Sequence, residues 1–561
     1  MYSNIELFTM IAIIVLLTKP LGTYMYNIFE YKPMRSDKIF LPVENFIYKI
    51  TGINPEEEMD WKKYALTFLL VNMVMMIITY FILRVQQFLP LNPTGAKNME
   101  SSLAFNTVIS FMTNTNLQHY AGEDGITFLS QMIVIVFLMF TSAASGLVTA
   151  AAIMRGLSKK TTNLGNFYAD FVRITVRLLL PISMLATLIL VWQGVPQTFA
   201  GKVVVDTLEG GKQTIITGPV AVLESIKHLG TNGGGFFKAN SSHPFENPTW
   251  LTNMIEMLLM MLLPTSLIYT YGLMINNKKH ALVLYISLFV IFILLAVGAV
   301  YAENHPGVAY SKLYIDGTPY GNYEGKEVRF GVSQSPLFAT VTTAFTTGSV
   351  DSMHDSYTPL GGAVPLILMM LNTIFGGDGA GLQNIIMYTI LTVFLTGLMV
   401  GRTPEYLGRK IETKEIKLIA LAILVHPFLI LFSSALTVML KVGASSVTNP
   451  LYHGLTQVLY EFSSAAANNG SEFAGFIGNT VFMNIMTGLV MFFGRYITII
   501  LMLAVAGSMA EKIPAPPSPG TFRTDNAIFG AIFIAVVLIV GALTFFPVVI
   551  LGPISEFLSM T

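Results

Sequence analysis

The sequence predicts an all-α polytopic membrane protein with ten transmembrane helices. Eight of them form four related helix–loop–helix repeats in pseudo-fourfold arrangement, and one further helix flanks the set at each end. Three observations support this fold class. The chain of 561 residues is 53% hydrophobic and only 11% charged, whereas soluble globular domains carry about 25% charged residues. Ten apolar runs reach the roughly 20 residues that a helix needs to cross a bilayer. Four short polar motifs recur at nearly equal steps.

The predicted spans are the long apolar runs of the chain. They are Ile5–Met25, Tyr64–Val85, Phe128–Met154, Val172–Val195, Trp250–Ile275, Ala281–Tyr301, Ala363–Val400, Ile416–Met439, Val481–Met509 and Ala527–Leu551. The first run has Glu6 near its start and basic residues such as Lys32 after it, the reverse of a signal peptide, so we expect an uncleaved helix. Gly376–Gly381 should interrupt the seventh run, because each glycine costs a helix about 1 kcal/mol relative to alanine.

Each of the four motifs follows an apolar run too short to cross a membrane, as in re-entrant segments. The short runs are Leu103–Met112, Val220–Leu229, Leu337–Phe345 and Leu455–Ala467. The motifs read T-N-T-N, T-N-G-G, T-T-G-S and N-N-G-S, and their third residues are Thr115, Gly233, Gly348 and Gly470. The steps between these residues are 118, 115 and 122. A single such cluster would be a surface turn, but four at matched spacing favour one unit used four times.

These observations give a domain organisation. We predict an N-terminal transmembrane helix and cytoplasmic loop in 1–60, pore repeats in 61–155, 168–276, 280–402 and 412–509, and a C-terminal transmembrane helix in 525–551. The third repeat contains the broken second helix.

Basic residues gather in one set of loops, which the positive-inside rule assigns to the cytoplasm. The set comprises Lys62, Lys63, Arg155, Lys159, Lys160, Arg173, Lys278, Lys279, Arg402, Arg409, Lys410, Lys414, Lys512 and Arg523. The opposite loops carry the motifs and carboxylates such as Glu246 and Asp351, which we expect to be solvated. The motifs therefore enter from outside, and both termini are predicted to lie outside.

The motifs are suited to a dehydrated monovalent cation. Non-helical backbone at membrane depth is tolerated only inside protein or beside a water-filled cavity. Four converging segments could replace the hydration shell of an ion with backbone carbonyls and Thr or Asn oxygens. The motifs contain no carboxylate, which favours K⁺ over Ca²⁺ or Mg²⁺.

Several other classes of function are excluded or disfavoured. The net charge of zero argues against a nucleic-acid partner, and the absence of cysteine excludes thiolate chemistry. The chain has neither a DKTGT phosphorylation motif nor a phosphate-binding loop, so it holds no recognisable site for ATP hydrolysis. A polytopic membrane enzyme would need an intramembrane catalytic pair, and the spans offer none.

At these motifs the chain resembles a known family, the potassium-binding and translocating A subunit of Kdp-type potassium-transporting ATPases. The resemblance covers essentially the whole length. It rests on T-N-T-N-L-Q at Thr113–Gln118, H-L-G-T-N-G-G-G-F-F at His228–Phe237, A-N-S-S-H-P-F-E-N-P at Ala239–Pro248, M-H-D-S-Y-T-P-L-G-G at Met353–Gly362 and N-N-G-S-E-F-A-G at Asn468–Gly475. It implies a potassium-transporter superfamily fold with one pseudo-tetrameric pore and K⁺ as the transported ion. It also implies a bacterial inner-membrane complex with a P-type ATPase subunit and two small membrane subunits, and a sideways ion route toward the ATPase.

The resemblance also implies a set of filter residues. They are Thr113, Asn114 and Thr115; Thr231, Asn232 and Gly233; Thr346, Thr347 and Gly348; and Asn468, Asn469 and Gly470. Thr115 departs from the glycine of the other third positions, which is costly if its φ is positive. Gln118 either tunes the outer ion site by hydrogen bonding or holds a loop.

Two further residues are candidates for gating. Arg495 lies well inside the run Val481–Met509, where a charge costs about 2.5–3.5 kcal/mol on insertion scales. We expect it beneath the fourth motif, either blocking a straight exit or setting how tightly the ion is held. Asp378 lies in the glycine-rich break, which we interpret as a gate beside the ion route.

The two leading functions differ in their energy source. The first is the potassium-selective subunit of an ATP-driven uptake complex, with hydrolysis supplied by the partner. The alternative is a stand-alone potassium channel or an ion-gradient-linked symporter with the same four-unit pore.

Overall fold

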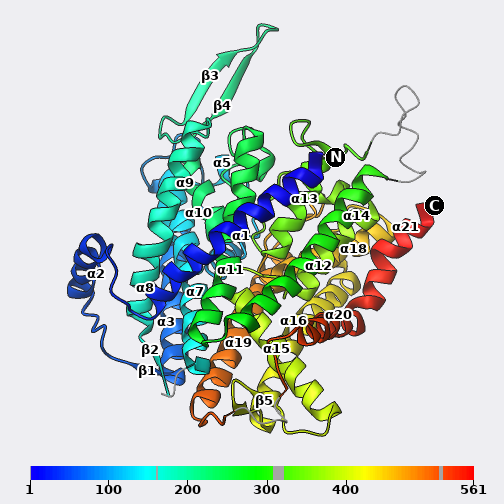
Figure 1. The fold of residues 1–561 in the computed structure, drawn as a ribbon. Coiled ribbons are helices and arrows are strands. Elements are labelled where there is room, and N and C mark those ends of the chain that lie inside the picture. Colours follow the sequence, from blue (N-terminus) through cyan, green and yellow to red (C-terminus); the bar gives the residue numbers. More distant parts are fainter. Residues whose placement is uncertain (1, 159–161, 307–320, 517–521, 561) are drawn as a thin grey trace.

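Ten helices are long and apolar enough to cross a membrane, counted over the residues that the computed structural model describes, 2–158, 162–306, 321–516 and 522–560. They form four consecutive units between two flanking helices (Figure 1). The predicted all-α polytopic fold class is therefore confirmed. Lys159 and Lys160, predicted to be cytoplasmic, lie outside the described residues.

Each unit has a first helix, a short helix that precedes the motif, and a second helix that follows it. The first unit contains α3 (Trp61–Arg84), α4 (Ser101–Met112), α6 (Phe128–Ser130), the π-helical turn η2 (Gln131–Val136) and α7 (Phe137–Ser158). The second contains α8 (Phe167–Ile174), the π-helical turn η3 (Thr175–Leu179), α9 (Leu180–Trp192), α10 (Val220–Leu229) and α11 (Trp250–Met274). The third contains α12 (Lys278–Asn304), α13 (Gly331–Ala344), α14 (Pro359–Leu371) and α15 (Ala380–Met399). The fourth contains α16 (Thr413–Met439), α18 (Leu451–Ala467) and α19 (Val481–Ala510). The flanking helices are α1 (Tyr2–Phe29) and α20 (Ala527–Val549), which continues through η6 (Ile550–Ile554) into α21 (Ser555–Met560).

The second helices of the units line the interior of the molecule. In the most apolar 18-residue stretch of α7, α11, α15 and α19, between 56% and 78% of the residues are buried. In the first helices of the units and in the flanking helices, the share is 22–44%. The first and flanking helices are therefore the ones that present apolar side chains to lipid, and the units close around their second helices.

The predicted interrupted span Ala363–Val400 consists of two separate helices, α14 and α15. The bounds of the membrane-crossing helix are therefore corrected to those of α15, Ala380–Met399. Helix α14 has only 13 residues and ends at Leu371, so α15 alone is long enough to cross. The break runs from Asn372 to Gly379 and turns through positive φ at Asn372, Gly376 and Gly379. The glycines supply the backbone freedom for this turn, as expected.

Small elements that the sequence did not reveal decorate the loops. Helix α2 (Asp37–Thr51) occupies much of the predicted cytoplasmic loop. Strands β3 (Lys202–Asp206) and β4 (Lys212–Ile216) pair as an antiparallel hairpin, with Val203 opposite Ile215, which projects from one end of the molecule (Figure 1). The remaining elements are β1 (Met59–Asp60) paired with β2 (Asn163–Gly165), β5 (Glu405–Tyr406) paired with β6 (Arg409–Lys410), α5 (Gly122–Gly125), α17 (Lys441–Ala444), η1 (Gln86–Phe88), η4 (Asn240–Ser242) and η5 (His354–Ser356).

Three arginines that were predicted as loop charges, Arg155, Arg173 and Arg409, are buried, which corrects that expectation. Arg155 makes a bidentate pair with Asp170, at 2.6 and 2.7 Å, and donates to the carbonyl of Phe29 at 2.5 Å. Arg173 lies 3.4 Å from Glu44 of α2. Arg155 and Arg173 join α1, α2, α7 and α8 because a buried guanidinium needs a carboxylate partner.

We predict that Asp170→Asn destabilises the protein strongly. The substitution leaves the Arg155 guanidinium buried without its counter-charge, which typically costs about 3–5 kcal/mol. Thermal unfolding of the detergent-solubilised protein should show a marked fall in midpoint. The matched control is Asp525→Asn, which removes an ion pair to an Arg523 side chain that is 73% exposed and should change the midpoint little. Equal effects of the two changes would contradict the prediction.

The C-terminal helix α21 is clamped to the start of α18 by one histidine. His453 Nδ1 lies 2.7 Å from Glu556 of α21, and its Nε2 lies 3.0 Å from Asp355 of η5. Burial opposes a charge on His453, but the hydrogen bonds to Asp355 and Glu556 outweigh burial and raise its pKa to about 9. The imidazolium therefore bridges the two carboxylates at neutral pH.

We predict that this clamp weakens in alkaline solution. Because the folded pKa lies above the unfolded value of about 6.5, the stabilisation is complete below that value and is lost as pH rises through about 9. Unfolding midpoints of the native protein and of His453→Gln should therefore differ at pH 7 and converge toward pH 10. A difference that stays constant over this range would refute the assignment.

Candidate functional site

The four motifs meet in a closed ring. A methyl group on Gly233 would lie 2.5 Å from the carbonyl oxygen of Thr347. A methyl on Gly348 would collide with the carbonyl oxygen of Asn469, and one on Gly470 with that of Thr115. The circle closes through the first motif, where Asn116 donates to the carbonyl of Gly233 at 3.2 Å. Each motif thus touches the next, and the predicted third-position residues lie together rather than on separate sides of the molecule.

The structure shifts the alignment of the first motif by one residue. In every motif one backbone N–H donates to the carbonyl five residues earlier, at 2.8–2.9 Å. The donors are Thr115, Asn232, Thr347 and Asn469. These four residues are therefore equivalent, and Thr115 is a second-position residue. The prediction that Thr113, Asn114 and Thr115 match the other three triplets is wrong; the matching triplet is Asn114–Asn116.

Backbone angles explain the shift. The first positions are left-handed, with φ of 61° at Asn114, 45° at Thr231, 43° at Thr346 and 57° at Asn468. The third positions also have positive φ, 56° at Asn116, 145° at Gly233, 88° at Gly348 and 107° at Gly470. Asparagine tolerates the left-handed region far better than a β-branched residue does. Asn116 can therefore replace glycine, and Thr115 avoids the expected strain. The asparagine at position 116 was the feature of the sequence that could have revealed the correct alignment of the first motif.

Asparagine side chains brace the ring, although the buried Oδ1 of Asn116 has no hydrogen-bond partner in the described part of the chain. Asn114 Nδ2 donates to the carbonyl of Thr231 at 2.7 Å, and Asn469 Nδ2 donates to the carbonyl of Thr342 at 2.8 Å. Ser142 Oγ lies 2.8 Å from Asn114 Oδ1 and 3.1 Å from Asn232 Oδ1. The expected contribution of Asn oxygens is thereby reduced, which leaves chiefly the backbone carbonyls, the threonine hydroxyls and the amide oxygen of Asn116.

The short helices direct partial charge toward the ring. Helices α4, α10, α13 and α18 end at Met112, Leu229, Ala344 and Ala467, directly before their motifs. The carboxyl end of a helix carries about half a negative charge. Four such ends at one place favour a cation without any carboxylate in the ring.

Gln118 holds two units together. Its amide nitrogen donates to the carbonyl of Gly235 at 3.1 Å, and its amide oxygen accepts from the N–H of Gly235 at 2.7 Å. Both polar groups of this side chain are committed to the loop behind the second motif. The loop-holding interpretation therefore has direct geometric support.

The break in the third unit lies against the second motif. The backbone N–H of Asp378 donates to Thr231 Oγ1 at 2.8 Å. The Asp378 carboxylate is buried, and neither oxygen has a hydrogen-bond partner among the described residues. Asp378 and Arg495 approach each other across Gly146, because a methyl there would lie 2.8 Å from Arg495 Nη2 and would collide with the Asp378 carbonyl. The two predicted gating residues therefore both lie next to Gly146.

A cavity of about 60 Å³ lies beside these residues. Asn372 and Gln383 line it from the third unit, and Asn468 and Arg495 line it from the fourth. It therefore connects the surroundings of the fourth motif with the broken helix.

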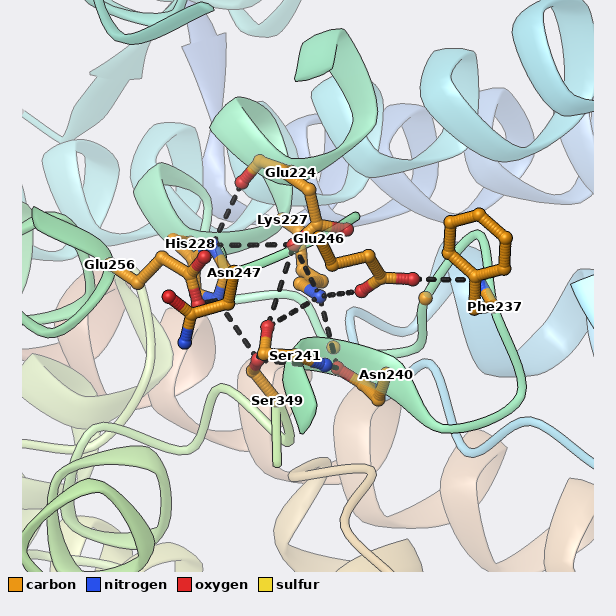
Figure 2. A network of polar contacts seen from close by, with 12 residues as sticks. Glu224, Lys227, His228, Phe237, Asn240, Ser241, Glu246, Asn247, Glu256 and Ser349 are labelled. Carbon is orange, nitrogen blue, oxygen red and sulfur yellow. Dashed lines mark hydrogen bonds and ion pairs between the residues drawn. The ribbon is translucent and has the colours of Figure 1, made fainter. Parts of the chain in front are cut away.

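A fully buried charge network stands behind the second and third motifs (Figure 2). Lys227 Nζ lies at its centre, 2.6 Å from Glu224 and 2.8 Å from Glu246. It also donates to Asn240 at 2.9 Å and to Ser241 at 3.0 Å. Glu246 in turn accepts from the N–H of Phe237 at 2.6 Å. The loop that follows the second motif is thereby fastened to helix α10.

The same network reaches the third motif. His228 Nε2 lies 2.8 Å from Ser349 Oγ and 3.2 Å from Glu256. The expectation that Glu246 and Asp351 are solvated is wrong, because both are fully buried. The network was not foreseen, although Glu224 and Lys227, three residues apart inside an apolar run, were a signal of it.

Comparison with known proteins identifies the family of the chain. The potassium-transporting ATPase A subunit family matches residues 8–558. The chain belongs to this family, as its motifs predicted. A curated relative from Caldanaerobacter subterraneus subsp. tengcongensis, named potassium-transporting ATPase potassium-binding subunit, is 99% identical over 561 residues and covers 100% of both chains. A relative of the same name from Geobacillus kaustophilus is 56% identical over 551 residues, or 98% of each chain.

One solved structure supports the fold. The crystal structure of the potassium transporter TrkH from Vibrio parahaemolyticus aligns with 88% of this chain and 97% of its own, with a TM-score of 0.52 at 12% identity. At this identity the likeness concerns the fold alone. It agrees with the pseudo-fourfold arrangement of the four units.

We predict that Lys227→Met unfolds the surroundings of the ring. The change leaves Glu224 and Glu246 buried without their shared cation, at a cost of about 3–5 kcal/mol. Thermal unfolding should show this loss, and Lys227→Met combined with Glu224→Gln should recover part of it. Lys238→Met, which alters an exposed lysine of the adjoining loop, is the control. A stable single variant would show that the network contributes little.

Proposed function

We propose that this chain is the potassium-binding and translocating subunit of an ATP-driven potassium uptake complex. It takes K⁺ from outside into a filter built from the four motifs and passes the ion toward a P-type ATPase partner. The observation that carries this proposal is the closed ring of motifs, in which residues from four units contact one another in turn.

The filter uses backbone oxygens. In this proposal the carbonyl groups of Asn114–Asn116, Thr231–Gly233, Thr346–Gly348 and Asn468–Gly470 replace the hydration shell of K⁺, as carbonyl rings do in potassium channels. Thr113 supports the first segment from behind, since its hydroxyl lies 2.8 Å from that of Thr115. The ends of four short helices add negative potential at the same point.

In this proposal Asp378 and Arg495 control the movement of the ion beneath the filter. The Arg495 charge opposes a straight descent of the cation to the cytoplasm, or sets how tightly the filter holds its ion. The break around Asp378 acts as a gate, and the cavity lined by Asn372, Gln383, Asn468 and Arg495 offers an ion a sideways step. Gln118 sets the geometry of the outer ion site through its grip on Gly235.

Family membership supports a proposal for the partners and the membrane. We infer assembly with a P-type ATPase subunit and two small membrane subunits in the inner membrane of a bacterium. Both termini lie toward the end of the molecule that carries the β3–β4 hairpin (Figure 1), and we place this end outside the cell. Membership of an ATPase subunit family favours this function over the stand-alone channel or symporter.

We predict that Gly470→Ala weakens the response to potassium. A methyl group at φ 107° is strained and would collide with the Thr115 carbonyl, which distorts the ring. The K⁺ concentration for half-maximal, vanadate-sensitive ATP hydrolysis by the purified complex should rise by about tenfold or more, which corresponds to about 1.4 kcal/mol.

Gly298→Ala is the matched control, because a methyl on Gly298 meets nothing within 4 Å. An unchanged potassium response in Gly470→Ala would contradict the filter. A chain that copurifies with no vanadate-sensitive ATPase would favour the channel or symporter instead.

A further inference from the structure

Three side chains that can ligate a metal meet where the first and fourth units join. His119 follows the first motif, Glu461 lies on α18, and Glu472 follows the fourth motif. One ligand atom of each lies within 4.8 Å of the others. The filter does not use these residues, and no ion pair with lysine or arginine is found for either carboxylate within the described part of the chain.

The orientation of His119 is fixed by Asn484. His119 Nδ1 lies 2.7 Å from Asn484 Oδ1, while Asn484 Nδ2 donates to Ser102 and Asn479, each at 3.1 Å. The amide oxygen of Asn484 must therefore accept from the N–H at Nδ1 of His119. This leaves Nε2 to face the carboxylates, which is the arrangement of metal-ligating histidines, whose second nitrogen donates to a fixed oxygen.

The spacing suits a bound metal better than direct hydrogen bonds. Nε2 lies 3.4 Å from Glu461 Oε1 and 3.6 Å from Glu472 Oε1, whereas N–H···O bonds centre near ~2.9 Å. A zinc ion ~2.1 Å from its ligands holds neighbouring tetrahedral ligands ~3.4 Å apart. A nitrogen and two carboxylate oxygens, with a fourth place for water, is a donor set that Zn²⁺ accepts.

Unpartnered carboxylate oxygens support the site. Glu461 is fully buried, yet its Oε2 has no hydrogen-bond partner in the described ranges, and neither does Glu472 Oε1. Gly478 lies against the ring of His119, where a methyl would be 2.9 Å from Nε2. The Glu472 side chain is 22% exposed, so the cluster lies at the edge of the buried interior, with the Oε1 of Glu472 on its inner side.

We propose that His119, Glu461 and Glu472 bind Zn²⁺. His119 lies three residues beyond Asn116 of the first motif, and Glu472 lies two residues beyond Gly470 of the fourth. One zinc ion would therefore join two adjacent quarters of the ring. Binding should stiffen the ring at this junction and slow the passage of potassium.

Calorimetric titration of the purified complex with zinc chloride, in the absence of ATP, tests binding directly. We expect one site that is weakened by about tenfold or more in Glu461→Gln and in Glu472→Gln. Asn484→Ala should weaken it about 10–100-fold through the loss of the oxygen that orients His119. His305→Gln, which changes an exposed histidine, is the control and should bind as the native complex does.

The functional arm measures potassium-stimulated ATP hydrolysis with and without zinc chloride. Zinc should inhibit the native complex and leave Glu472→Gln unaffected. Because the Glu472 side chain is partly exposed, this variant should fold even if Glu461→Gln does not. Zinc affinity that is the same in the native complex and in Glu472→Gln would overturn the site, and would mean that His119 is simply an imidazolium between two carboxylates. This result would leave the potassium filter itself untouched.

Discussion

A chain that leaves its helix at membrane depth finds no water for its backbone groups, so the protein itself must satisfy them. The whole structure answers this constraint at four places. Asn114, Asn469 and Gln118 donate side-chain hydrogen bonds to backbone carbonyls of neighbouring segments. In the proposed filter, the backbone oxygens that remain are therefore held in place before an ion arrives. Preorganisation of this kind is what allows carbonyl dipoles to replace a hydration shell without further rearrangement.

The loops behind the motifs are fastened by different residues in different units. In the second unit Lys227 Nζ contacts Glu224, Asn240, Ser241 and Glu246. In the third unit Glu303 accepts from Lys326 at 2.8 Å and from the N–H of Thr358 at 2.8 Å. Buried ion pairs of this kind add little net stability, because desolvation offsets attraction. Their effect here is to fix which loop packs against which helix, and hence the shape of the ring.

The sequence was sufficient for the four short helices, the meeting of the motifs and the spans other than Ala363–Val400, because length and hydrophobicity are local properties. It was insufficient for the register of the first motif. The order of residue types in the motifs places Thr115 opposite three glycines. The backbone φ angles show that Asn116 is the residue that occupies the same position as those glycines. Glu246 was taken for a solvated carboxylate because its partner, Lys227, lies on another element, and burial depends on such long-range pairing. Arg155 was misjudged for the same reason, since Asp170 neutralises it from a different helix.

Asn116 stands in the ring where its three counterparts are glycines. Since the four quarters belong to one polypeptide, an inherited change alters a single quarter, whereas in a homotetramer it would be copied four times over. Gene duplication followed by divergence can therefore tune one side of the opening while three sides stay as they were. One side of such an opening differs chemically from the other three. A neighbouring subunit can therefore recognise that one side, because the other three sides do not present the same surface.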